Sequence, residues 1–186
     1  MACVCLLLPS SWDHYSANAR QFEDKYDEQI EKAVKRWWRT EGDWHWWKAQ
    51  LYQESLLDPN ALSPVGASGL AQFMPATWDD VSHRLGLVGV SPRSAKHAID
   101  AGAYYMSTLS RGWSSERPAL DRLQLAQASY NAGFGSLLAA QRACNGAVMY
   151  DGIICCLPSI TGRHSDETIG YVYRIAIWKQ QMDIDR

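Results

Sequence analysis

The sequence predicts an all-α protein. Apolar residues recur at intervals of three and four along most of the 186 residues, which is the spacing of one buried helix face. The strict apolar–polar alternation of Val, Ile and Thr that is typical of strands is scarce. Asp, Ser, Pro and Gly lie where the helical periodicity begins or ends, as helix start and stop signals should.

The first two predicted helices lead into a loop. One face of the first helix carries apolar residues at helical spacing, and we expect this helix to end near 40–42: Phe22, Tyr26, Ile30, Ala33 and Val34. Asp43 is a suitable cap for a second helix over about 44–56, because its carboxylate accepts free N–H groups of the first turn. Asp58-Pro59-Asn60 stops that helix, and residues 57–74 are predicted to form a loop.

The remaining chain is predicted to hold five more helices. Their expected extents follow from Pro, Ser or Asp at the starts and Gly at the ends: 75–85, 91–109, 118–130 with Gly133 as a cap, 134–143, and a last helix from 165 or 166. Residues 144–164 are predicted to be irregular.

Composition excludes several classes of protein. Hydrophobic residues make up 47% of the chain, which excludes a disordered polypeptide. The net charge of −2 gives no general attraction to nucleic acid or to anionic membranes, so neither is an expected partner. Nine Trp and nine Tyr suit either a core or stacking against sugars and bases.

The five cysteines predict no metal site. They lie in two clusters, Cys3 with Cys5 and Cys144 with Cys155 and Cys156, and none forms the paired C-x-x-C of structural zinc sites. The histidines show no ligand spacing either, and we expect no cofactor. Cys144 is placed to bridge Cys155 or Cys156 across a loop, and buried thiols are the alternative.

The N-terminal stretch MACVCLLLPSSW is an apolar run of only seven residues without Lys or Arg before it. A secretion signal needs a basic start and a longer apolar run, and a membrane span needs roughly 20 apolar residues. We therefore expect residues 1–20 to form a tail docked on its own domain or on a partner, and residues 21–186 to form one domain.

Glu54 is the charged residue with the strongest case for a chemical role. On the predicted helix it shares a stripe with Trp47 and Leu51, which should face the core. Burial disfavours a charged carboxylate and raises its pKa, and a carboxylic acid that is neutral near neutral pH is what general acid catalysis requires. The alternative is that Glu54, in the last helical turn, bends out to water.

Two further clusters contain residues suited to ligand contact. Gly66-Ala67-Ser68-Gly69 is backbone that a ligand can approach closely, and Gln72 after it both donates and accepts hydrogen bonds. Phe73 and Met74 add apolar surface. The segment Ser129-Tyr130-Asn131-Ala132-Gly133 sets a phenol and an amide at a helix end, where a cap and a buried Tyr would be the structural explanation.

Together these clusters resemble a known family. The motifs Glu54-Ser55, GASGLAQFMP, SYNAG and ETIGYV occur in the order and approximate spacing of the lytic transglycosylases of the Slt type, which are related to goose-type lysozyme. The resemblance covers roughly residues 24–180 and implies a single lysozyme-like domain. The loop and the ending TGRHSDETIGYVYRI resemble phage and prophage members most closely. Ala71 and Ser129 depart from the family, which often has Met and Ala there.

The resemblance implies a role for each matching residue. Glu54 matches the catalytic acid/base, Ser63 a serine that contacts the acid or the substrate, and Tyr130 the tyrosine whose hydroxyl reaches the catalytic carboxyl. The other matching residues are implied to line or border the substrate groove: Ser55, Gly69, Gln72, Phe73, Met74, Asn131, Glu167 and Tyr171.

The implied substrate is the glycan strand of peptidoglycan, and the implied reaction is cleavage of the MurNAc–GlcNAc β-1,4 bond. Attack of the MurNAc C6 hydroxyl then gives a 1,6-anhydro end without a second carboxylate. Hydrolysis by a muramidase needs such a second acid, for which Asp58, Asp79 and Asp80 are the candidates, although capping or solvation also explains them.

The resemblance to phage members also bears on how the enzyme reaches the wall. We expect the protein to travel in a phage particle and to breach the cell wall during genome ejection, with other virion or envelope-spanning proteins as partners. A bacterial protein that reaches the periplasm by a non-classical route is the alternative. A structural virion or assembly protein that binds glycan without cutting it is the alternative function.

Overall fold

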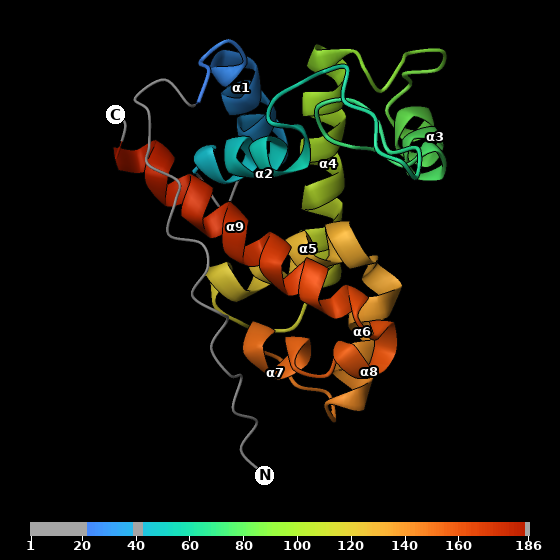
Figure 1. Cartoon of the computed structure of the whole chain (residues 1–186), viewed down its shortest axis with the longest axis vertical. Helices are drawn as coiled ribbons and strands as arrows, with labels where there is room; N and C mark the ends of the chain where they lie inside the picture. Colours follow the sequence, from blue (N-terminus) through green and yellow to red (C-terminus); the bar gives the residue numbers. More distant parts are fainter. Residues whose placement is uncertain (1–21, 39–42, 185–186) are drawn as a thin grey trace.

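The computed structural model describes residues 22–38 and 43–184, and the helices found there confirm the predicted all-α fold (Figure 1). The predicted N-terminal tail lies outside the described residues. The helices, in chain order, are α1 (Asp27–Trp37), α2 (His45–Ser55), α3 (Pro75–Arg84), α4 (Ala95–Gly112), α5 (Ala119–Ala132), α6 (Phe134–Ala143), α7 (Tyr150–Ile154), α8 (Pro158–Thr161) and α9 (His164–Ile184). No helix of the described part is long and apolar enough to cross a membrane.

The long helix α9 joins two groups of helices. Figure 1 shows α1–α4 on one side and α5–α8 on the other, with α9 running across both. Helix α9 packs on α2, α5 and α8, while α1 packs on α4. Because α2 and α9 come from opposite ends of the chain, their contact brings the predicted Glu54 motif and the predicted ETIGYV motif together.

Helix α2 is buried on nearly all sides. Trp47 and Leu51 are fully buried, as their predicted stripe requires, and the polar residues His45, Lys48 and Gln50 are buried as well. Asp43 accepts the backbone N–H of His45 through Oδ1 at 3.0 Å, as a cap should. Since buried charges need partners, Lys48 Nζ lies 2.6 Å from Asp27 Oδ1.

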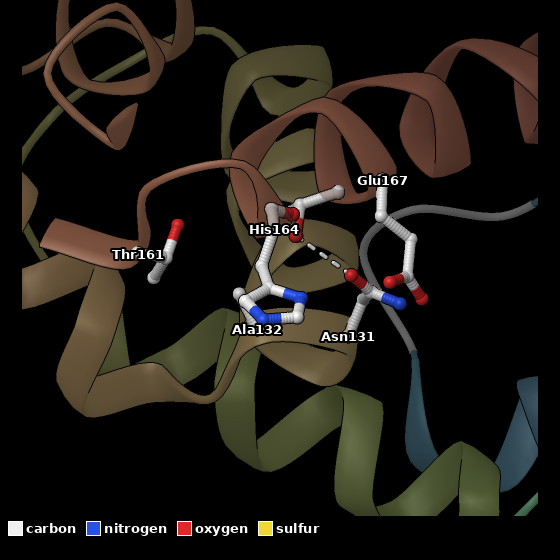
Figure 2. A pocket seen from close by; sticks show the side chains of 6 residues that line it. Asn131, Ala132, Thr161, His164 and Glu167 are labelled. Carbon is white, nitrogen blue, oxygen red and sulfur yellow. Dashed lines mark hydrogen bonds between the residues drawn. The ribbon is translucent and has the colours of Figure 1, made fainter. Parts of the chain in front are cut away.

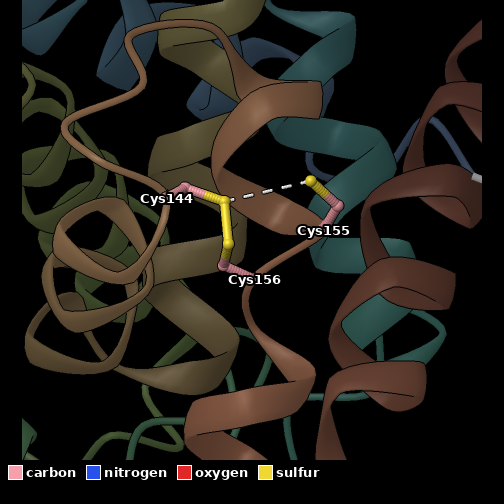
Figure 3. A group of neighbouring side chains, drawn as sticks. All are labelled: Cys144, Cys155 and Cys156. Atoms are coloured by element: carbon pink, nitrogen blue, oxygen red, sulfur yellow. Dashed lines mark hydrogen bonds between the residues drawn. A yellow bond between two sulfur atoms is a disulfide. The ribbon is translucent and has the colours of Figure 1, made fainter. Parts of the chain in front are cut away.

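The prediction of irregular structure over residues 144–164 was wrong in part. Helices α7 and α8 lie there, with five and four residues. Helices this short are not stable alone, so periodicity cannot reveal them, and tertiary contacts must hold them. One such link is the disulfide between Cys144 and Cys156, which settles the pairing that the sequence left open (Figure 3). Cys155 Sγ lies 4.0 Å from Cys144 Sγ.

Candidate active site

Glu54 lies in the last turn of α2, where the helix stops abruptly. Leu56 and Leu57 both have left-handed backbone conformations (φ 54° and 63°), which turn the chain away from the helix axis. Ser55 Oγ donates to the Leu70 carbonyl at 2.9 Å and so ties the helix end to the loop that follows. The predicted groove residue Ser55 therefore holds the frame of the site.

The carboxyl group of Glu54 is enclosed by protein, while the residue as a whole remains partly exposed. Tyr171 of α9 donates its hydroxyl hydrogen to Glu54 Oε1 at 2.5 Å. Burial raises the pKa of Glu54 to about 8, against the lowering effect of this hydrogen bond and with a further raising effect from the charge of Glu167. Glu54 is thus a neutral acid at pH 7, and the alternative of a solvated carboxylate is excluded.

The loop after α2 is held by its own polar groups. Ser63 Oγ accepts the backbone N–H of Ala67 at 2.9 Å, and Gln72 Nε2 donates to the carbonyls of Gly69 (2.9 Å) and Ala61 (3.3 Å). Gly69 is buried with φ +79°, and an added Cβ would lie 2.1 Å from the Pro92 carbonyl oxygen. These predicted substrate contacts thus have a visible structural function, which is to fix the loop beside Glu54.

Phe73 does not offer its ring to a ligand, contrary to the prediction. It is 2% exposed and packs edge-on against Trp78, with its centroid 5.1 Å away, and near Tyr130 at 6.3 Å. Its ring joins the core because no polar atom requires water. Met74, the next residue, is 43% exposed and keeps its predicted position on the surface.

The tyrosine that reaches the acid is also different from the predicted one. The Tyr130 hydroxyl donates to the carbonyl of Ala71 at 2.7 Å, whereas the hydroxyl on Glu54 is that of Tyr171, which is 3% exposed. The charge of Glu54 still contributes to raising the pKa of Tyr130, after burial, so the two groups are neighbours. Helix α9 crosses α2 closely enough to supply the hydroxyl, which the sequence could not indicate.

A cavity of about 400 Å³ lies where the end of α5 faces the start of α9 (Figure 2). Two predicted residues line it, Asn131 and Glu167, and both are exposed. Thr168 donates to Asn131 Oδ1 at 2.7 Å, which leaves the amide N–H groups of Asn131 for a ligand. Thr161, His164 and Thr168 were not predicted as site residues, because only the packing of α5 on α9 brings them to the cavity.

Two groups of side chains have the proximity of metal ligands. Cys144, Cys155 and Cys156 form one, but two of these sulfurs are bonded to each other. Asp43, His45 and Asp183 form the other, and there Lys179 Nζ lies 2.8 Å from Asp43 and 2.5 Å from Asp183. The lysine ammonium takes the place of a cation, so neither group is a convincing metal site.

The chain belongs to a family of lysozyme-like enzymes. Residues 32–147 match the model of the Transglycosylase SLT domain, which confirms the family that the motifs predicted. Glu167 and Tyr171 lie beyond the matched residues, and only the fold places them beside Glu54.

Relatives with known sequences include membrane-bound lytic murein transglycosylases F. That of Actinobacillus pleuropneumoniae serotype 3 is 35% identical over 118 residues, which is 63% of this chain and 22% of the relative. That of Desulfosudis oleivorans is 32% identical over 149 residues, 76% of this chain and 31% of the relative. The chain therefore spans less than a third of the length of these two relatives.

Solved structures agree with this assignment. An inactive mutant of the lytic transglycosylase Slt of Pseudomonas aeruginosa superposes with a TM-score of 0.66 at 25% identity, over 87% of this chain and 25% of that one. The 70 kDa soluble lytic transglycosylase of Escherichia coli gives 0.64 at 25% identity, over 85% and 24%.

Proposed function

We propose that this protein is a lytic transglycosylase of peptidoglycan, which cleaves the MurNAc–GlcNAc β-1,4 bond and leaves a 1,6-anhydro-MurNAc end. The observation that carries the proposal is Glu54, a carboxylic acid that is neutral at pH 7 and bonded to Tyr171 within an SLT domain. The related proteins are named as lytic murein transglycosylases, which supports the same substrate.

In the proposed reaction Glu54 acts first as acid and then as base. Its proton passes to the glycosidic oxygen as the bond to the MurNAc C1 breaks. The resulting carboxylate accepts the proton of the MurNAc C6 hydroxyl as its oxygen attacks C1. The acid is restored without water, and the attacking group is already part of the substrate, which lowers the entropic cost of the attack.

The positions of the other carboxylates favour this route over hydrolysis. Asp58 Oδ1 accepts the backbone N–H of Asn60 at 2.8 Å in a turn, Asp80 is paired with Arg84 at 2.9 Å, and Asp79 is exposed. These contacts explain all three residues without catalysis. Glu167 is the carboxylate whose charge acts on Glu54, so it is the candidate base for the alternative, a hydrolytic muramidase.

We propose that the exposed residues near the acid contact the glycan: Met74, Asn131 and Glu167. Ser55, Ser63, Gly69 and Gln72 support that groove through the loop contacts described above. Phe73 and Tyr130 form the packed layer beneath it.

Mass analysis of digested sacculi tests the function. Anhydro products, lighter by one water than reducing ends, are expected, while reducing ends alone would establish the muramidase. Glu54→Gln should abolish cleavage with the fold intact, and Glu116→Gln, at an exposed position, should leave it unchanged. A Glu54→Gln variant that cleaves at the wild-type rate would refute the proposed acid.

For its biological setting we propose carriage in a phage particle and action on the cell wall of the infected bacterium. The support is the resemblance of the loop and of residues 161–175 to phage members. Mass spectrometry of purified particles from a strain that encodes the protein should detect it. Its absence from the particles, together with its presence in the periplasm, would favour a bacterial wall enzyme. Glycan binding without cleavage would favour the structural alternative.

A further inference from the structure

Gln50 is a buried polar residue whose place in the fold the proposed reaction does not yet explain. It lies on α2 one turn before Glu54, is fully buried, and has apolar core residues on both sides, Ala49 and Leu51. An amide in such surroundings costs free energy unless its hydrogen bonds are made. Its contacts therefore indicate what it does.

The nitrogen of the Gln50 amide is the end that has partners. Nε2 lies 3.3 Å from Met106 Sδ, and the same side chain hydrogen-bonds to the phenol of Tyr171. Oε1 of Gln50 is buried and has no hydrogen-bond partner within the described part of the chain. Both N–H groups thus have a target, one on sulfur and one on the Tyr171 oxygen.

This donor fixes the direction of the Tyr171 hydroxyl. A phenol has a single hydrogen, and its oxygen here accepts from Gln50. The hydrogen is therefore directed at Glu54 Oε1, 2.5 Å away. An oxygen that accepts this hydrogen is the carbonyl-like oxygen of a neutral carboxyl group, so the acid proton belongs on Oε2.

We propose that Gln50 is a positioning residue which, through Tyr171, holds the proton of Glu54 on Oε2, the oxygen that delivers it to the substrate. The inference rests on the proposed function, since it assigns the reacting oxygen of the same acid. Without Gln50, the Tyr171 hydroxyl is free to accept from Glu54 instead of donating to it, and the acid proton is then turned away from the substrate.

The test replaces Gln50 by Met, which has a similar volume and no N–H donors. With sacculi as substrate we expect kcat to fall about three- to tenfold, the size of effect given by one lost hydrogen bond, with KM unchanged. The Tyr171 hydrogen bond lowers the pKa of Glu54, so weakening it should move the alkaline limb of the pH profile upward. The titratable groups around Glu54, namely Tyr130, Glu167 and Tyr171, are all retained in this variant.

A double-mutant cycle separates positioning from packing. If Gln50 acts only through Tyr171, then Gln50→Met should have little further effect on kcat in a Tyr171→Phe background. Gln127→Met is the matched control, because Gln127 is also a fully buried glutamine, on α5, and has no hydrogen bond to the Tyr171–Glu54 pair. It should change stability at most, and leave the pH profile in place.

Carbon-13 NMR of the Glu54 carboxyl group provides a readout that needs no activity. Its titration midpoint should rise in Gln50→Met and stay unchanged in Gln127→Met, and Gln50→Leu serves if the Met variant does not fold. An unchanged midpoint, or additive losses of kcat in the double variant, would overturn the inference. A wild-type protein without cleavage would instead refute the proposed function, while the NMR result would still decide whether Gln50 acts on Glu54.

Discussion

Replacing Glu54 by Gln should make the protein more stable, and the gain should grow with pH. The pKa of Glu54 is raised from its ordinary value of 4.5 to about 8 in the folded protein, chiefly by burial. Between these values the folded chain keeps the proton, whereas the unfolded chain releases it. The free energy of unfolding therefore decreases as the pH rises through this window, by about 1.36 kcal/mol per pH unit where the difference is complete.

The magnitude follows from the two pKa values. Below pH 4.5 both states are protonated, and Glu54 costs the folded state nothing. From pH 5 to pH 7 the cost increases by about 2.5 kcal/mol, and above pH 8 it levels off at roughly 5 kcal/mol. A neutral glutamine of almost the same shape has no such cost, so the difference between variant and wild type should show the same rise.

Urea unfolding followed by Trp fluorescence at pH 5, 6 and 7 measures this difference. Equal m-values in the two proteins would show that the same surface is exposed on unfolding. The exposed variant Glu116→Gln is the control, and its stability relative to wild type should not depend on pH over this range. A Glu54→Gln difference that is the same at pH 5 and pH 7 would mean that the folded protein holds an ionised Glu54. The case for a neutral general acid would then fail.

Three further predictions concern the frame and the surface of the site. Cys144→Ser should lower the free energy of unfolding by about 2–3 kcal/mol under oxidising conditions, since the bond to Cys156 closes a short loop, and an unchanged urea midpoint would contradict this. Gly69→Ala should cost about 3 kcal/mol or more, because its Cβ would collide with the Pro92 carbonyl at a left-handed φ; a wild-type Tm would be inconsistent with that geometry. Met74→Ala should change stability by less than about 0.5 kcal/mol, as expected for an exposed side chain, yet raise KM for sacculi, and an unchanged KM would remove Met74 from the proposed groove.

The sequence predicted most of the helical frame because that frame follows local rules. Pro75 begins α3, Asp43 caps α2, and Gly133, with φ +86°, ends α5, each as its backbone chemistry requires. The short helices α7 and α8 escaped prediction because their stability comes from packing and from a disulfide across the chain. The limits of α1 differed too, since Phe22 packs on Tyr52 and Trp178 from outside the helix.

By itself, the sequence determined which carboxyl group matters and why its pKa should rise. The periodicity of Trp47, Leu51 and Glu54 is local, and a carboxyl group on a buried stripe loses water whatever else surrounds it. Only the tertiary structure decided which hydroxyl meets that acid. Tyr130 and Tyr171 are both buried near Glu54, and the crossing of α9 over α2 selects Tyr171. A hydrogen bond depends on tenths of an ångström between residues 117 positions apart, and no sequence pattern specifies that distance.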